Sequence, residues 1–233
     1  MILDDRYDRL TRKLSIIAPE GPPLAQICHG GATLLGVTGV AVVLMTQAEP
    51  AAVVASYGIR SDQLERLHLE LGDGPGFDAF QVGGPIVAAD LSDGARDRWP
   101  AFADRATADG ARAAFVFPLQ LGALRLGVLY LTRDRTGPLS AEQLADAIDL
   151  ADMAMLAVLD IQTGAASGKL GAGLDGNWTH RAAVHQATGM VSAQLGTDLV
   201  DALARIRAHA FAAGRSIYEV AGDITSGQLR LEP

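Results

Sequence analysis

The segment Gly72-Asp73-Gly74-Pro75-Gly76-Phe77-Asp78-Ala79-Phe80 lies near the middle of the chain, and Gly84-Pro85-Ile86-Val87-Ala88-Ala89-Asp90-Leu91 follows it closely. The glycines and the proline of residues 72–76 predict a turn, because these residue types favour backbone angles that helices and strands do not use. The turn lacks the preceding strand and the following lysine of a phosphate-binding loop. We therefore expect a structural turn, followed by a strand over residues 85–89.

Helical and strand patterns continue on both sides of this turn. The expected strands cover residues 40–45, 51–55, 85–89, 113–119 and 126–131, and the expected helices cover residues 3–17, 23–35 and 98–109. Two helices come first, then two strands, a segment of helix and loop, and three more strands. This order predicts an α+β fold in which helices pack against an antiparallel sheet.

A long helix is expected to complete this part of the chain. It begins after Ser140, whose hydroxyl can accept from the backbone N–H of Gln143 while the Gln143 side chain reaches back, which is the capping-box arrangement. Apolar residues line two sides of this helix, so both sides must be buried. One side can cover the sheet, and the other can meet the N-terminal helix or a second chain. We expect a homodimer held by these two helices, with Leu10 and Met153 at the contact.

The chain is expected to divide at residues 164–177, where small residues and repeated glycines offer no side chains for a core. Residues 1–163 then form one domain, and residues 178–233 form a smaller one. Three short helical patterns follow the linker, and the third begins with a second capping box at Ser216 and Glu219. Each helix is too short to be stable alone, so we expect the three to pack into one small bundle.

The larger domain resembles the GAF domains of bacterial regulators. The resemblance lies in the two segments quoted first, and in Phe117-Pro118-Leu119 and Leu126-Gly127-Val128-Leu129-Tyr130-Leu131. It covers roughly residues 20–162. It implies an antiparallel sheet flanked by helices, with a pocket on one face that binds a small molecule in some relatives and nothing in others.

The smaller domain resembles ANTAR domains over about residues 178–231. The matching segments are Val184-His185-Gln186-Ala187-Thr188-Gly189-Met190-Val191, Asp201-Ala202-Leu203-Ala204-Arg205-Ile206-Arg207-Ala208-His209-Ala210 and Gly214-Arg215-Ser216-Ile217. The resemblance implies a three-helix module that binds RNA hairpins in nascent transcripts, usually as a dimer, and so prevents a terminator from forming. Relatives often carry arginine at the position of Gln186 and lysine at the position of Thr188.

Polar side chains of this domain also suggest a surface when they are considered without the resemblance. Arg181, His185 and Thr188 have the spacing of one helix face, and Arg205 and His209 have the spacing of another. Arginine suits phosphate binding and base stacking, and histidine can stack or donate. The candidate RNA-binding residues are Arg181, His185, Gln186, Thr188, Gly189, Arg205, Arg207, His209 and Arg215. The alternative is that each is an ordinary solvated side chain.

Charge and hydropathy restrict the possible partners. The chain has 233 residues and a net charge of −8, which argues against a general nucleic-acid-binding surface. Residues 175–233 hold five arginines and six carboxylates, so this part is nearly neutral. No basic leader precedes an apolar run, and no stretch reaches the roughly 20 apolar residues needed to cross a bilayer. We therefore expect a cytoplasmic protein that binds no membrane.

Catalysis and cofactor binding are not expected. Methionine sulfoxide reduction needs two cysteines and the chain has only Cys28, which we expect in the core. Asp73, Asp78 and Asp90 could supply a carboxylate acid and base, although loop and cap roles suit them better. His68 is a conceivable haem ligand but is expected on a helix surface.

Cyclic-nucleotide GAF domains have an Asn-Lys signature, and the one asparagine here, Asn177, lies in the linker. We expect no metal and no cofactor, because no Cys/His cluster has ligand spacing. The expected function is antitermination by RNA-hairpin binding, controlled by a small molecule or by dimerisation. The alternative is a protein-interaction module with an empty GAF domain.

Overall fold

The computed structural model describes residues 2–18, 20–45, 50–58, 71–162 and 178–231. The chain divides into two compact units, Met1–Leu170 and Gly171–Pro233, and each has its own hydrophobic core. The linker expected at residues 164–177 and the side chain of His68 lie outside the described residues.

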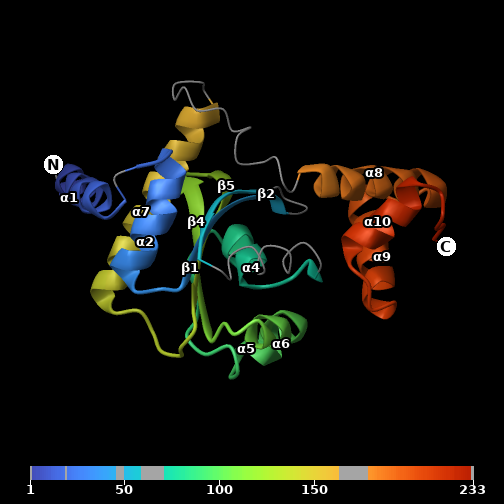
Figure 1. The fold of residues 1–233 in the computed structure, drawn as a ribbon, viewed down its shortest axis with the longest axis horizontal. Coiled ribbons are helices and arrows are strands. Elements are labelled where there is room, and N and C mark those ends of the chain that lie inside the picture. Colours follow the sequence, from blue (N-terminus) through green and yellow to red (C-terminus); the bar gives the residue numbers. More distant parts are fainter. Residues whose placement is uncertain (1, 19, 46–49, 59–70, 163–177, 232–233) are drawn as a thin grey trace. The chain divides into compact units, whose positions relative to one another are not determined.

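An antiparallel sheet forms the centre of the first unit (Figure 1), with strand order β2-β1-β5-β4-β3 in the described residues. Its strands are β1 (Gly39–Met45), β2 (Pro50–Tyr57), β3 (Ile86–Ala88), β4 (Ala113–Leu121) and β5 (Leu124–Arg133). Its helices are α1 (Ile2–Ile17), α2 (Pro23–Leu35), α4 (Pro75–Val82), α5 (Ala95–Arg98), α6 (Pro100–Ala108) and α7 (Ala141–Gln162). The predicted α+β arrangement, with helices flanking an antiparallel sheet, is confirmed.

Both faces of the sheet are covered, because alternate residues of a strand point to opposite faces. Val42 and Phe115 belong to the core under α2 and α7. Val43 and Val116 belong to a second core that includes residues of α4 to α6. The helix expected over residues 98–109 is present as α6, and it begins at Pro100 because Trp99, which precedes the proline, has a φ of −137° and a ψ of 70° that lie outside the α-helical region.

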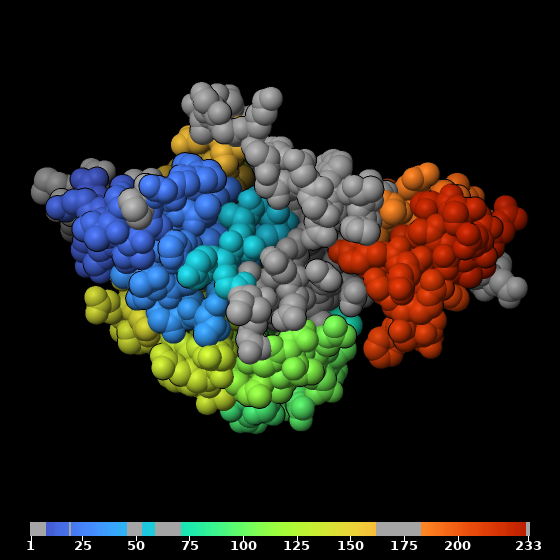
Figure 2. All heavy atoms as spheres, viewed as in Figure 1, coloured from blue at the N-terminus to red at the C-terminus, as the bar shows by residue number. Residues whose placement is uncertain are grey.

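Helix α1 packs on α2 and α7 of its own chain. Leu10 is fully buried there, and Asp146 of α7, itself buried, accepts an ion pair of 3.0 Å from Arg9. The sheet and the N-terminal helices therefore cover much of the apolar surface of α7, and Met153 is buried within the protomer, whereas Leu144, Ile148 and Leu156 remain exposed. The expectation that Leu10 and Met153 contact a second chain is wrong. The contact between α2 and α7 of one chain can be followed in Figure 2, where the blue atoms of α2 adjoin the yellow atoms at the start of α7.

The beginning of α7 has the predicted capping box. The backbone N–H of Gln143 donates to Ser140 Oγ at 3.1 Å, and the backbone N–H of Ser140 donates to Gln143 Oε1 at 2.9 Å. The Gln143 amide also donates to the Leu35 carbonyl at 2.8 Å. The cap therefore joins the start of α7 to the end of α2.

The second unit contains α8 (Trp178–Leu195), α9 (Leu199–Ala212) and α10 (Ile217–Thr225), which pack against one another. Val184, Ile206 and Val220 are fully or almost fully buried between them. Leu199, the first residue of α9, is exposed. None of the helices in the described residues is long and apolar enough to span a membrane.

Candidate nucleic-acid interface

The outer face of α9 brings together three of the candidate residues. Ala202, Leu203, Ile206 and Ala210 face the core, so the opposite side of the helix faces solvent. Arg205 and the half-buried His209, four residues apart, lie along one edge of the solvent side, and Arg207, which is half-buried with its Nη2 atom buried, lies along the other. Exposed alanines lie between these edges, at positions 204, 208 and 212. Because these side chains are small, a ligand can approach the backbone of the helix closely.

The candidate residues of α8 do not form one stripe. His185, Gln186 and Gly189 are exposed. Thr188 is only 7% exposed, and its hydroxyl donates to the Val184 carbonyl at 2.8 Å. The expectation that Thr188 belongs to a solvent-facing stripe is wrong, because this internal hydrogen bond lets a short polar side chain lie against the core. Arg181 is in α8, and its side chain lies outside the described residues.

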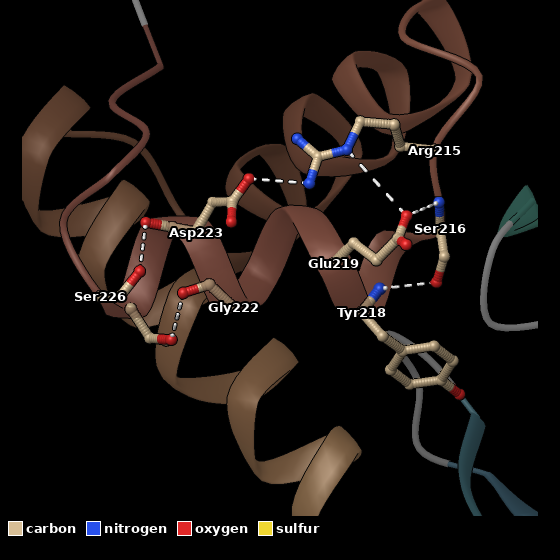
Figure 3. A network of polar contacts seen from close by, with 8 residues as sticks. Arg215, Ser216, Tyr218, Glu219, Gly222, Asp223 and Ser226 are labelled. Carbon is tan, nitrogen blue, oxygen red and sulfur yellow. Dashed lines mark hydrogen bonds and ion pairs between the residues drawn. The ribbon is translucent and has the colours of Figure 1, made fainter.

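Arg215 binds to carboxylates of its own module (Figure 3). Its Nη2 lies 2.8 Å from Asp223 Oδ2, and its Nε lies 4.0 Å from Glu219 Oε2. Glu219 also completes the predicted capping box, because it accepts the backbone N–H of Ser216 at 3.1 Å. Arg215 thus ties the α9–α10 turn to two successive turns of α10, and its positive charge is partly offset.

Sequence reasoning missed one exposed aromatic residue in this region. Phe211 of α9 is 76% exposed and lies four residues after Arg207. The signal was available: Phe211 directly follows Ala210, the last core-facing residue of α9, and so falls outside the buried stripe. Arg230 is also exposed, and it was not among the candidate residues.

In the first unit, Asp78 joins α4 to the α5–α6 segment. Its Oδ2 lies 2.7 Å from Arg98 Nη2 and accepts the Trp99 indole N–H at 3.1 Å. The Arg98 guanidinium also lies over the Trp99 ring, 4.8 Å from its centroid. Trp99 and Phe102 are buried, so they pack in the core. These contacts give Asp78 a structural role.

The remaining groups that were considered for catalysis or metal binding are dispersed. Asp90 Oδ1 accepts hydrogen bonds from the Ser92 hydroxyl and backbone N–H, which lower the pKa of Asp90. Burial raises the pKa of the Cys28 thiol to about 12, which keeps it protonated and poorly nucleophilic. Within the described residues no three His, Cys, Asp or Glu side chains are grouped to hold a metal ion.

Comparison with known proteins identifies the fold of the first unit. No family model and no curated protein matches the chain. The GAF domain of a Coxiella burnetii phosphoenolpyruvate-protein phosphotransferase is 16% identical, with a TM-score of 0.52, covering 70% of this chain and 96% of that domain. The corresponding Acinetobacter GAF domain is 13% identical, with a TM-score of 0.50, covering 67% of this chain and 93% of that domain. The first unit therefore has the GAF fold.

Proposed function

We propose that this chain is a cytoplasmic sensory transcription regulator. Its second unit is an ANTAR-like module that binds RNA hairpins in nascent transcripts and causes antitermination. The observation that carries the proposal is the outer face of α9, where Arg205, Arg207 and His209 flank exposed alanines. Arginines can contact phosphates from both edges of this face, and the small residues between them leave room for the RNA backbone.

Few phosphate contacts are available to one module, so useful affinity needs two. We propose that the GAF domains hold two chains together as a homodimer. Leu144, Ile148 and Leu156 are exposed along one side of α7, and the exposed Asp152 lies between Ile148 and Leu156 on that side. A second copy that covers this stripe would remove apolar surface from water and bring two modules into one complex, where the second contact becomes intramolecular. A signal in the GAF domain, either a small molecule or dimerisation itself, would then control RNA binding.

Binding to a pool of structured transcripts tests the RNA-binding proposal. We expect Arg205→Ala and Arg207→Ala in the full chain each to weaken binding by about 1 to 3 kcal/mol if the contact is close, and to lower the salt slope by about 1. Arg96→Ala is the matched control, because Arg96 pairs with Asp104 in the GAF unit. Wild-type affinity and salt slope in both α9 variants would exclude this face.

A protein-interaction module is the second candidate. The observation in its favour is that Val200 and Phe211 of α9 are both exposed apolar residues, 57% and 76% respectively. Two results together would favour this function over RNA binding. The wild-type chain would bind no transcript from the pool at low salt, and a protein partner that binds the wild type would fail to bind Val200→Asp.

A further inference from the structure

The end of β5 in the GAF unit carries a buried charged side chain whose hydrogen-bonding capacity is largely unused. Arg133 is only 4% exposed, and its guanidinium lies over the Phe115 ring, with Cζ 5.4 Å from the ring centroid. Its Nη1 donates to the Pro138 carbonyl at 3.4 Å. Its Nε and Nη2 are buried and have no hydrogen-bond partner in the described part of the chain. Because a buried charge without a partner is costly, this arrangement indicates a missing anion.

The two unused nitrogen atoms have the geometry of an oxyanion site. Nε and Nη2 lie on the same edge of the planar guanidinium, and their N–H groups form the fork that binds two oxygens of one carboxylate or phosphate. Arg133 lies on the face of the sheet that Phe115 shares with α2 and α7, opposite the core that includes residues of α4 to α6. The fork is therefore separate from the groups considered above for catalysis or ligand binding.

A second guanidinium lies close to the first. Arg135 is exposed, two residues after Arg133. Burial and the charge of Arg135 lower the pKa of the Arg133 guanidinium, whereas Asp134 raises it. Arginine nevertheless keeps its charge at neutral pH, so the two guanidiniums repel each other. An anion that contacts both would remove this repulsion, and a doubly charged anion would do so better than a singly charged one.

The loop between β5 and α7, residues 134–140, lies beside the fork, at the lower end of the sheet in Figure 1. The Gly137 N–H donates to the Ala89 carbonyl at 2.9 Å, and Pro138 accepts the long bond from Arg133. Most of the loop is exposed, including residues 134–136 and Pro138. Because the fork atoms are covered in this structure, an anion reaches them only when the packing around them opens, and this exposed loop is the part that can move.

We propose that Arg133 and Arg135 form an anion site for a phosphate group, in which Arg133 supplies the buried fork and Arg135 the exposed side. A tetrahedral phosphate can present two oxygens to the fork and keep others for the second guanidinium. This inference goes beyond the proposed function and does not depend on RNA binding, because both arginines belong to the GAF unit. It gives that unit a specific class of ligand.

Inorganic phosphate titrated into the full chain tests the site. At constant pH and ionic strength, with chloride as the anion that phosphate replaces, we expect a saturable rise in the unfolding temperature of the wild type. The Nε–H resonance of Arg133 should shift along the same binding curve. Arg96→Ala is the matched control for the loss of one positive charge, since Arg96 pairs with Asp104 on the surface, and it should bind phosphate like the wild type.

Three variants separate the fork from general charge effects. Arg133→Lys keeps the charge but removes the fork, so it should weaken phosphate binding by about tenfold or more. Arg133→Met should abolish the phosphate response, and in chloride it should be at least as stable as the wild type, because it removes an unpaired buried charge. Arg135→Ala should weaken binding several-fold and keep the wild-type unfolding temperature in chloride, because its side chain is exposed.

Two further anions define the ligand. Acetate should bind more weakly than phosphate, and equal or tighter acetate binding would overturn the choice of phosphate. Glycerol 3-phosphate identifies the source of the group: binding as tight as that of inorganic phosphate supports a phosphorylated small molecule, and much weaker binding supports the free ion. The site is wrong if about 10 mM phosphate changes neither the unfolding temperature nor the Nε–H resonance of the wild type, or if Arg133→Lys binds phosphate like the wild type.

Discussion

Arg215 Nη2 and Asp223 Oδ2 form an ion pair of 2.8 Å that connects the α9–α10 turn to the second turn of α10. Arg215 is a candidate RNA-binding residue, and the pair gives it a structural role as well. The side chains are 40% and 29% exposed, so solvent screens the interaction and its stabilisation is about 0.5 to 1 kcal/mol. Loss of RNA binding in an Arg215 variant could therefore have two causes, and Asp223 variants separate them.

We expect Asp223→Asn to destabilise the module slightly and to retain or strengthen RNA binding, because Arg215 keeps its charge and loses its carboxylate partner. Arg215→Ala should destabilise the module by a similar amount, and we also expect it to weaken binding by about 1 to 3 kcal/mol if the guanidinium contacts RNA closely. Denaturant unfolding and RNA titration of both variants measure the two effects. If both variants reduce affinity equally, Arg215 acts only through the fold.

Asp78 variants test the connection between α4 and the α5–α6 segment. Asp78→Ala should lower the free energy of unfolding by about 1 to 3 kcal/mol, because the indole N–H of Trp99 would be left without an acceptor in a site that is only 5% exposed. Asp78→Asn can still accept that hydrogen bond and loses only the partly exposed ion pair with Arg98, so its cost should be below about 1 kcal/mol. Urea unfolding followed by tryptophan fluorescence measures both. Equal losses for Ala and Asn would show that the charge, and not the hydrogen bond, holds these helices.

The homodimer is tested on the exposed stripe of α7. Ile148→Asp and Leu156→Asp should each raise the dimer dissociation constant by about tenfold or more, because a charge would be buried in the apolar contact. Ile16→Asp is the control, since Ile16 is more exposed still but lies on α1. Leu10 and Met153 are unsuitable positions, because both are buried in the protomer and their replacement by Asp would disrupt the fold. Sedimentation of a monomeric wild type at micromolar concentration would contradict the dimer.

The sequence predicts those parts of the fold that depend on local signals. Periodicity located the sheet and its helices, and two Ser-x-x-Gln/Glu capping boxes marked the starts of α7 and α10. Periodicity does not show which element covers a given apolar stripe, because the covering element is determined by tertiary contacts. Met153 packs inside its own protomer, while Leu144 and Ile148, on the same helix, remain exposed.

The candidate interface was less predictable for the same reason. Spacing placed Thr188 with His185, but one turn of helix offers several faces, and the hydrogen bond to the Val184 carbonyl turns Thr188 inward. The ion pair between Arg215 and Asp223 depends on how two helices meet. Phe211 could have been found, because the buried stripe of α9 ends at Ala210 and leaves the following aromatic residue without a place in the core.

Alkaline titration of Cys28 provides a test of the GAF core. Burial raises the pKa of this thiol from 9.0 to about 12, so the folded state retains a proton that the unfolded state loses above pH 9. The stabilisation from this group is fully present below pH 9 and decreases as the pH rises toward 12. Wild type should lose about 2 kcal/mol relative to Cys28→Ala between pH 9 and about pH 10.5, because each unit is about 1.4 kcal/mol. Urea unfolding of both proteins across this range measures the difference.

The packing cost of the alanine variant does not depend on pH, and other titrating groups cancel in the comparison. A constant difference, or rapid labelling of the native thiol by a disulfide reagent at pH 8, would show that Cys28 is accessible to solvent.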